Sequence, residues 1–502
     1  MHAAAVRGDV AVIGAGLVGT AVAAELARAG AEVVLVDAGW SPADAPATHL
    51  RNAPPCSRDR ALYYDLLRAH LRPVSVAPPR TSLLGDDVPV AAAGGGVNPA
   101  QAPARSMPGA RTTAAAGGMG TLWTCVAPRF APGERWDGIG DREWDALYER
   151  AEHALAVGTD THAGSRRQER MLAALRAATP APARAEPAPV AARRGPDGRV
   201  EWTGPREVLR RGLGEARLHA LLGHHAAQRL VHAGGRVRAA QVADLLTGET
   251  ARVEAGTFVL ALGALRTPAL LFASGLCRDP AGALGRWLSD HPLCHGQVVL
   301  RPDLAAGKED DPEPFVVVPA SAERPFHGLL VCDAYDSAAL EGNVDLRLLV
   351  SLYWYARAEP DRENRVVFDD RHRDHVGLPQ PAFDYRVPAV ERERAALAVE
   401  DLRAHGNAIG RFVPSRPPRV TAPGSSMHLL GTTRIGRRDD GESVVDPFGR
   451  VWESPNLYAC GTGLIATPTA TNPSLTAVAL ALRTADALAG RAPAAAAARG
   501  KG

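Results

Sequence analysis

Residues 9–39, DVAVIGAGLVGTAVAAELARAGAEVVLVDAG, constrain the fold more than any other stretch of the chain. The apolar run at 10–13 predicts a strand, 17–29 predicts a helix, and 32–36 predicts a second strand. A strand, a glycine-rich turn, a helix and a strand in this order predict a βαβ unit on a parallel sheet.

The turn between the first strand and the helix carries a GxGxxG pattern, formed by Gly14, Gly16 and Gly19. Gly14 allows a tight turn, Gly16 lets a pyrophosphate approach the backbone, and Gly19 lets helix and strand pack closely. Asp37 follows Gly16 by 21 positions (37 − 16), a spacing that suits an acid bonded to a ribose hydroxyl. The pattern predicts dinucleotide binding without separating FAD from NAD. The alternative is a glycine-rich turn in an unrelated parallel sheet.

A second strand–glycine–helix pattern lies near the C-terminus. The segment NLYACGTG (456–463) predicts an apolar strand that runs into a turn at Gly461. Pro473 suits the first position of a helix, which we expect to end near Gly490. The N-terminus of such a helix can present its N–H groups and its dipole to the polar edge of a cofactor.

Two side chains around this segment could carry chemistry, His428 and Asn472. An imidazole titrates near neutral pH and can take the proton of an alcohol, and an amide beside it can orient the hydroxyl. Each residue also has a plain structural interpretation. Asn472 could cap the following helix, and His428 could be a hydrogen-bonded histidine of the core.

Length and composition place the chain among ordinary globular proteins. Its 502 residues predict more than one domain, and 46% hydrophobic and 22% charged residues are typical of a soluble protein. A net charge of +2 gives no reason to expect nucleic acid or an anionic membrane as a partner. The six cysteines are far apart and form no CxxC pair, which argues against a zinc site or a disulfide framework. With no signal peptide and no apolar run long enough to span a bilayer, we expect a cytoplasmic protein.

The first half of the chain also contains segments with weaker signals. Residues 40–106 are rich in Pro and Ala and predict few helices, and His49 within them is expected to be structural. Residues 111–129 hold Gly117, Gly118 and Gly120, which predict either a backbone close to a flat ring or a plain tight turn. Helices are predicted within 149–178, and the Ala/Pro-rich residues 180–198 predict an exposed loop or linker.

The second half changes character twice. Residues 217–253 predict short strands joined by turns, and 255–275 predict a strand, a turn at Gly263 and a helix. Residues 296–418 predict mainly antiparallel strands. His291, in SDHPLCH, is expected to be structural.

Several of these segments together resemble the glucose–methanol–choline (GMC) oxidoreductases, which bind FAD. Within that superfamily the chain is most similar to the pyranose oxidases and to bacterial glycoside 3-oxidases related to them. The matching segments follow the order of the family along most of the chain: GGMGTLWTCVAPRF (117–130), VEWTGP (200–205), RAEPDRENRVVF (357–368), LPQPAFDYRVP (378–388), MHLLGTTRIG (427–436) and NLYACGTG…TNPSLTA (456–477).

The resemblance implies an α/β fold, with a Rossmann-like FAD-binding domain and a second, mostly antiparallel substrate domain. We expect the FAD domain to combine residues 1–130, 215–295 and 425–490. We expect the substrate domain to be 296–424 with parts of 40–110. Residues 131–214 are expected to be a helical insertion that contains the 180–198 loop, and 491–502 a disordered tail.

The resemblance also implies roles for single residues. His428 and Asn472 would be the catalytic pair, Arg357 would lie near the sugar, and residues 333–337, with Asp333 and Tyr335, would form the substrate loop. Thr124 would lie near the reactive edge of the flavin. The residues expected to contact FAD are Gly14, Gly16, Gly19, Asp37, Gly118, Met119, Gly120, Thr121, Leu122, Thr124, Gly263, Gly461, Pro473 and Thr476. No metal is expected.

One departure from the family pattern bears on how FAD is held. The fungal pyranose oxidases carry a histidine bonded to the flavin between the Thr and the Trp of the glycine-rich segment, where this chain has Leu122. A leucine cannot form that bond, so we expect noncovalent FAD.

The predicted reaction is oxidation of a ring secondary hydroxyl of a sugar or glycoside to a ketosugar. The hydride would go to flavin N5 and the proton to His428, and oxygen or a quinone-type acceptor would reoxidise the flavin. One alternative is a C- or O-glycoside 3-oxidase acting on glycosides of plant phenols, and oxidation at C2 or at C3 stays open. A second is a GMC oxidoreductase for a non-sugar alcohol, and a third is a dinucleotide-binding protein without catalysis.

Overall fold

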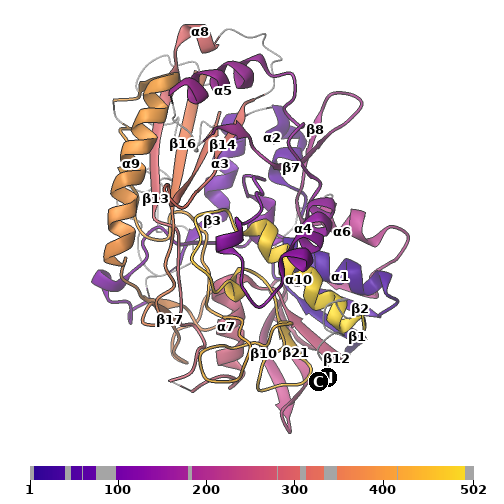
Figure 1. The fold of residues 1–502 in the computed structure, drawn as a ribbon. Helices are drawn as coiled ribbons and strands as arrows, with labels where there is room; N and C mark the ends of the chain where they lie inside the picture. The colour runs from indigo at the N-terminus through magenta and orange to yellow at the C-terminus, as the bar shows by residue number, and fades with distance from the viewer. Residues whose placement is uncertain are drawn as a thin grey trace, which may run out of the picture.

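The computed structural model describes residues 5–39, 47–58, 60–74, 98–178, 184–279, 281–305, 313–332, 348–414 and 416–491 (Figure 1). The predicted substrate loop, with Asp333 and Tyr335, lies outside the described residues, as does nearly all of the predicted tail, 492–502. None of the helices in these ranges is long and apolar enough to cross a bilayer.

A mixed sheet carries the strands of all three strand–glycine–helix patterns found in the sequence, at 9–39, 255–275 and 456–490. Its order is β10-β11-β12-β1-β2-β9, with β21 paired to β12. Strands β21, β12, β1, β2 and β9 pair in parallel, in that order. Strand β12 is also paired antiparallel with β11, and β11 is paired antiparallel with β10. The strands are β1 (Val6–Ile13), β2 (Val33–Val36), β9 (Ala220–Leu222), β10 (His225–Ala233), β11 (Arg236–Asp244), β12 (Thr250–Leu260) and β21 (Leu457–Ala459).

The glycine pattern explains how this sheet receives its first helix, α1 (Leu17–Arg28). A Cβ at Gly19 would lie 1.8 Å from the carbonyl oxygen of Gly14, so any other residue would force α1 away from β1. Gly14 itself has φ +105°, a backbone conformation that favours glycine. The sheet and α1 lie beside α10 (Ser474–Leu488) at the lower right of Figure 1. Helix α10 is buried from Leu475 to Ala485 and belongs to the core of the protein.

A second sheet is antiparallel throughout and forms the other half of the molecule. Its order is β19-β13-β16-β15-β14-β6, with β20 also paired to β13. One face, with Val350, Leu352 and Trp354, packs in a core with helices α5 (Arg166–Ala178) and α9 (Ala389–Ile409). Helix α9 runs along this sheet at the left of Figure 1. These strands are β6 (Glu186–Pro187), β13 (Leu293–Leu300), β14 (Phe315–Val318), β15 (Phe326–Val331), β16 (Leu349–Ala356), β19 (Gly410–Phe412) and β20 (Arg419–Val420).

Three small sheets and further helices complete the fold. The sheets pair β3 (Leu71–Pro73) with β4 (Arg111–Thr113), β17 (Arg365–Val367) with β18 (Ala382–Asp384), and β5 (Val157–Gly158) with β7 (Val190–Arg194) and β8 (Val200–Trp202). The remaining helices are α2 (Pro54–Arg58), α3 (Arg60–His70), α4 (Asp141–Leu155), α5 (Arg166–Ala178), α6 (Pro205–Leu213), α7 (Gly263–Ala273), α8 (Pro302–Ala305) and α9 (Ala389–Ile409).

The predicted fold class is confirmed, because a Rossmann-type α/β unit stands beside an antiparallel sheet. One local prediction is wrong, and two helices were not predicted. Residues 184–198 are not an exposed loop, since β7 is paired on both sides and buries Val190 and Ala191. The stretch 40–106 contains α3, and the predicted strand region 296–418 contains the 21-residue helix α9.

Candidate active site

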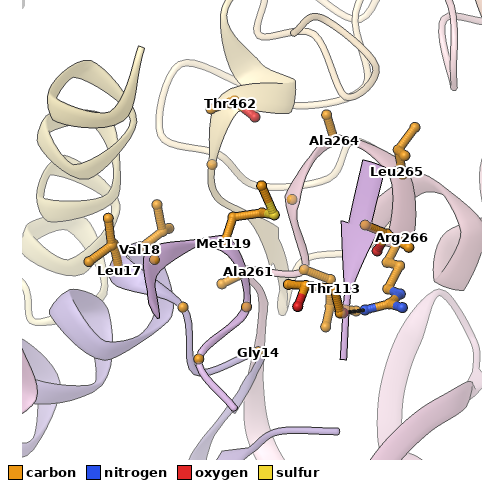
Figure 2. Close-up of a pocket in the computed structure, with 18 of the residues that line it drawn as sticks. Gly14, Leu17, Val18, Thr113, Met119, Ala261, Ala264, Leu265, Arg266 and Thr462 are labelled. Atoms are coloured by element: carbon orange, nitrogen blue, oxygen red, sulfur yellow. Dashed lines mark hydrogen bonds between the residues drawn. The ribbon is translucent and has the colours of Figure 1, made fainter. Parts of the chain in front are cut away.

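A cavity of about 300 Å³ lies where the first sheet, the glycine-rich segment and the start of α10 meet (Figure 2). Leu17 and Val18 of α1 line one side, Met119 lies in the middle, and Ala264 to Arg266 of α7 line the opposite side. The residues predicted to contact a cofactor that line the cavity are Gly14, Gly16, Asp37, Gly118, Met119, Gly120, Gly263, Gly461 and Pro473. His428 lines it as well.

Three glycines give the cavity room that side chains would remove. Gly118, Gly263 and Gly461 have φ values of +60°, +74° and +119°. At each of them the space that a Cβ would take is open. Gly117 and Gly120 serve a different purpose, because a Cβ at either would lie 2.7 Å from the side chain of Pro205 or Leu17. The glycine-rich segment therefore combines close packing against protein at Gly117 and Gly120 with open space at Gly118.

The carboxylate of Asp37 ties the walls of the cavity together. Its Oδ2 accepts a hydrogen bond from the N–H of Ala15 at 2.8 Å. Its Oδ1 accepts from Gly39 at 2.8 Å and from Gly117 at 3.3 Å. Two carboxylate oxygens can accept about four hydrogen bonds, so Asp37 keeps capacity for a ribose hydroxyl.

The N-terminus of α10 places positive electrostatic potential at one end of the cavity. Pro473, Ser474 and Ala477 line it, and the first N–H groups of a helix have no partners within the helix. The open space at Gly118, Gly263 and Gly461, the carboxylate of Asp37 and this helix N-terminus fit the ribose, pyrophosphate and ring of FAD.

His428 and Asn472 meet beside the cavity. The amide Nδ2 of Asn472 lies 3.3 Å from Nε2 of His428. Helix α10 has no side-chain cap, so the amide of Asn472 is not used as the N-cap that its position allowed. Its Oδ1 is buried and has no hydrogen-bond partner among the residues that the structure describes. The pair therefore presents one unused acceptor next to an imidazole nitrogen.

The other ring nitrogen of His428 contacts a residue that sequence reasoning assigned to structure. Nδ1 of His428 lies 3.0 Å from Nδ1 of His291, which is buried just before β13. Nothing local in SDHPLCH separates His291 from the equally buried His295 four positions later. Only the fold reveals the contact, because 137 positions separate the two partners.

Burial keeps these imidazoles uncharged. Loss of solvent lowers the pKa of His428 to about 3 and the pKa of His327, nearby on β15, to about 3. The pKa of His291 lies well below its ordinary value because of burial, with smaller contributions from His428 and His327. At neutral pH His428 is therefore a neutral imidazole with a lone pair available to take a proton.

Asp290 holds the turn that carries His428. Its carboxylate accepts hydrogen bonds from the N–H of Gly424 at 2.9 Å, from the N–H of His428 at 3.0 Å and from the hydroxyl of Ser426. Burial raises the pKa of Asp290 to about 6, partly offset by these donors. The same turn holds Met427 at φ +58°, a conformation that side chains rarely adopt.

Glu134 holds the loop that carries Asn472 in place through hydrogen bonds. Its buried carboxylate accepts from the hydroxyls of Thr469 and Thr471 and from the N–H groups of Ala131, Ala470 and Thr471, at 2.7 to 3.3 Å. Its carbonyl oxygen accepts from the hydroxyl of Thr467 at 2.5 Å. No motif in the sequence pointed to Glu134, since it lies more than 330 positions from this loop.

The remaining residues predicted to contact the cofactor do not line the cavity, as the described residues define it. They are Gly19 in the first turn of α1, Thr121, whose hydroxyl donates to Ala116, the buried Leu122, the exposed Thr124, and Thr476, whose hydroxyl is hydrogen-bonded to that of Tyr148. Arg357 follows β16, and its neighbour Ala358 donates to Thr469 of the Asn472 loop at 2.9 Å. His49 is structural as expected, because its ring bonds the carbonyl of Trp123 and the N–H of Arg51. Within the described ranges, His, Cys, Asp and Glu form no group able to hold a metal ion.

The sequence of the chain is similar to those of known protein families and of characterised enzymes. Two models described as GMC oxidoreductase match residues 134–293 and 360–481, and a model described as FAD dependent oxidoreductase matches residues 9–80. The chain is 29% identical to a pyranose 2-oxidase of Lyophyllum shimeji, over 95% of this chain and 91% of that protein. It is 31% identical to a C-glycoside 3-oxidase of Arthrobacter globiformis, over 95% of this chain and 93% of that protein.

A solved structure shares the fold. The chain superposes on pyridoxine 4-oxidase from Mesorbium loti with a TM-score of 0.68 and 18% identity, covering 95% of this chain and 98% of that one. The glycine-lined cavity, the two matched models and the relative of 31% identity agree with one another. The chain belongs to the GMC oxidoreductase family and is an FAD-dependent enzyme that oxidises an alcohol carbon.

Proposed function

We propose that this protein oxidises a secondary hydroxyl on the ring of a sugar or glycoside to a ketone. The observation that carries the proposal is the pairing of His428 Nε2 with Asn472 Nδ2, at 3.3 Å, beside the FAD cavity. The similarity to a pyranose 2-oxidase and to a C-glycoside 3-oxidase supports a sugar as the substrate.

The residues that would hold FAD are the backbone around Gly14 and Gly16, the carboxylate of Asp37, the open positions at Gly118, Gly263 and Gly461, and the start of α10. When bound, FAD supplies a hydride acceptor at its N5 atom. Leu122 stands where fungal pyranose oxidases attach the flavin through histidine, so we infer that FAD is held noncovalently. A flavin released by acid or heat would support this.

Residues of the protein would accept the hydroxyl proton of the substrate and orient the hydroxyl. Nε2 of His428 would take the hydroxyl proton of the substrate, and general-base help of this kind is worth roughly 100- to 10,000-fold in rate. For this step the amino group of Asn472 would turn from Nε2 of His428 to the oxygen of the reacting hydroxyl, which frees the lone pair of Nε2 for the proton and orients the hydroxyl. Oδ1 of Asn472, buried and without a hydrogen-bond partner among the described residues, would accept from a second hydroxyl of the substrate. Asn472 is buried and His428 is half-buried at the edge of the cavity, so bound substrate and cofactor would cover the pair from water.

We assign the FAD to the unit built from 1–130, 215–295 and 425–490, and the sugar to 296–424. Arg357 is proposed to contact the sugar, supported by its place beside the Asn472 loop. Asp333 and Tyr335 keep the role of substrate-loop residues as a proposal from sequence. The acceptor that reoxidises the flavin is proposed to be oxygen or a quinone, and reoxidation by each in turn would identify it.

An anaerobic mixing experiment tests the proposal. The purified protein is mixed with D-glucose, with a glycoside of a plant phenol and with benzyl alcohol, and loss of the oxidised-flavin absorbance is followed. Faster bleaching by glucose indicates a pyranose-oxidase-like enzyme. Faster bleaching by the glycoside indicates the second candidate, a glycoside 3-oxidase. Bleaching by benzyl alcohol alone would contradict a sugar substrate.

A further inference from the structure

The proposed function does not use the contact between the rings of His291 and His428. The two Nδ1 atoms lie 3.0 Å apart, and their rings meet edge to face with centroids 5.1 Å apart. His291 is buried, and His428 is half-buried where it lines the cavity. Among the described residues, His291 and Asn472 are the hydrogen-bond partners of the His428 ring.

The positions of the protons follow from the partners. Two neutral imidazoles facing each other through Nδ1 share one proton, so one ring donates and the other accepts. The amide Nδ2 of Asn472 is a donor, which requires a lone pair on Nε2 of His428. His428 then carries its proton on Nδ1 and donates it to Nδ1 of His291. The opposite arrangement would place Nε2–H of His428 against the Asn472 amino group, donor against donor.

The other described residues around the His428 ring are less suited than His291 to accept a hydrogen bond from its Nδ1. The carboxylate of Asp290 is engaged by the backbone of Gly424 and His428 and by Ser426. The ring of Tyr355, from β16, lies 5.0 Å from the ring of His428 and 6.1 Å from that of His291. His327 of β15 is also a neutral imidazole in this cluster.

We propose that His291 is a positioning residue that holds His428 as the Nδ1–H tautomer and stabilises the imidazolium formed during catalysis. The proposal rests on the proposed function, because it assigns His428 Nε2 as the base. In the step concerned, the O–H bond of the substrate breaks and an N–H bond forms at Nε2. The hydride leaves the carbon with its electron pair for the cofactor. His291 keeps its own proton on Nε2 and accepts a stronger, charge-assisted hydrogen bond from Nδ1–H of His428.

Three substitutions separate the hydrogen bond from the volume of the ring. In His291→Asn, Oδ1 takes the place of Nδ1 and can still accept, so flavin bleaching should stay within about threefold of the wild type. In His291→Leu the acceptor is lost, and bleaching should slow by about tenfold or more. In His291→Asp, a carboxylate beside the imidazole should shift the acid limb of the bleaching rate to higher pH.

His295→Leu is the matched control. His295 is as buried as His291, and burial also lowers its pKa, to about 3. Within the described ranges neither of its ring nitrogens has a hydrogen-bond partner. It lies on β13 and is not one of the two described hydrogen-bond partners of the His428 ring. We expect His295→Leu to leave the bleaching rate and its pH dependence unchanged.

A second readout needs no turnover. Buried imidazole protons exchange slowly and give downfield proton NMR signals, so one such signal should be present in the wild type and in His291→Asn and lost in His291→Leu. Equal bleaching rates for the Leu and Asn variants, with FAD bound in both, would overturn the inference. Failure of the proposed function looks different, because the wild-type flavin would then not bleach with any sugar or glycoside.

Discussion

The cofactor cavity and the proposed catalytic centre, His428 and Asn472, are neighbours built in opposite ways. The cavity is lined by backbone and glycines that come from short local patterns, such as Gly14 and Gly16 at the start of α1. The catalytic centre is made of side chains brought together from distant parts of the chain. His428 is held by Asp290 and His291, and the Asn472 loop is held by Glu134.

This difference determines what damages each region. In the cavity, the harmful change is an added atom, because a Cβ would take space that the cofactor needs. At the catalytic centre, the harmful change is a lost acceptor, because buried donors then have no partner. The two regions should therefore fail separately, one in FAD affinity and the other in the rate of flavin reduction.

The largest effect is expected at the centre. His428→Ala should slow the bleaching of the flavin by substrate at least about a hundredfold, since the base is removed. FAD should remain bound, because the cavity is made mainly of other residues. Anaerobic stopped-flow absorbance gives the rate, and the flavin-to-protein absorbance ratio gives the occupancy. A variant that loses FAD would show that the two regions are not separable.

Glu134→Gln tests the support of the Asn472 loop. A glutamine has one acceptor oxygen, so some of the five donors that Glu134 satisfies would face an amino group. We expect the unfolding free energy to fall by about 2–4 kcal/mol and bleaching to slow with FAD still bound. Urea unfolding and stopped-flow measure the two effects.

Glu152→Gln is the control for Glu134→Gln. Glu152 pairs with Arg129 at 2.6 and 2.7 Å in a partly exposed position, and such pairs contribute little. If Glu134→Gln bleaches as fast as Glu152→Gln, the carboxylate does not position Asn472.

Gly118→Ala tests the cavity, with Gly198→Ala as its match. Both glycines have positive φ, +60° and +79°, and open space where a Cβ would be. Only Gly118 lines the cavity. Both variants should lose about 1 kcal/mol of stability from backbone strain, and Gly118→Ala alone should bind FAD more weakly, by about tenfold. Titration of apoprotein with FAD measures the affinities, and equal affinities would show that Gly118 is not part of the cradle.

The smallest effect concerns the neutral state of the buried imidazoles. Burial lowers the pKa of His162 to about 4, as it lowers that of His428, but His162 stacks on Phe315 away from the cavity. Below pH 6.5 the unfolded chain binds a proton that folded His162 does not, so this histidine lowers stability as the pH falls from 6.5 toward 4.

His162→Phe should therefore gain about 1 kcal/mol of stability at pH 5.5 relative to its effect at pH 7.5. Its bleaching rate should be unchanged. Together the two results would show that burial alone keeps an imidazole neutral, whereas catalysis depends on the residues around His428. Urea unfolding at the two pH values measures the difference. An equal effect at both would show that His162 titrates normally.

The cavity was the part of the site most accessible to sequence reasoning. GxGxxG, Gly118, Gly263 and Gly461 are visible because a positive φ or a close approach demands glycine at single positions. His428 and Asn472 were found through the segments around them and the family resemblance. His291, Asp290 and Glu134 were missed, because their partners are far away in the sequence and nothing local marks a residue that accepts hydrogen bonds from another segment.

The same reasoning explains the errors in the fold. The strand–glycine–helix units at 9–39 and 456–490 were predicted well, because each begins with an apolar strand that is largely buried. Helix α9 was missed because its buried positions alternate with many charged residues over a region rich in strands. Strand β7 was missed because its VAARR sequence is stabilised by β5 and β8 rather than by its own composition.

The most direct test of the central claim uses deuterium on the sugar ring. The wild-type protein is mixed anaerobically with glucose, or with the glycoside that bleaches it fastest, labelled at C2 or at C3. We predict that one label slows the bleaching and the other does not, which identifies the carbon that loses its hydride. Equal rates with both labels and with unlabelled substrate, at a bleaching step not limited by binding, would contradict oxidation of a secondary ring hydroxyl at either of these carbons.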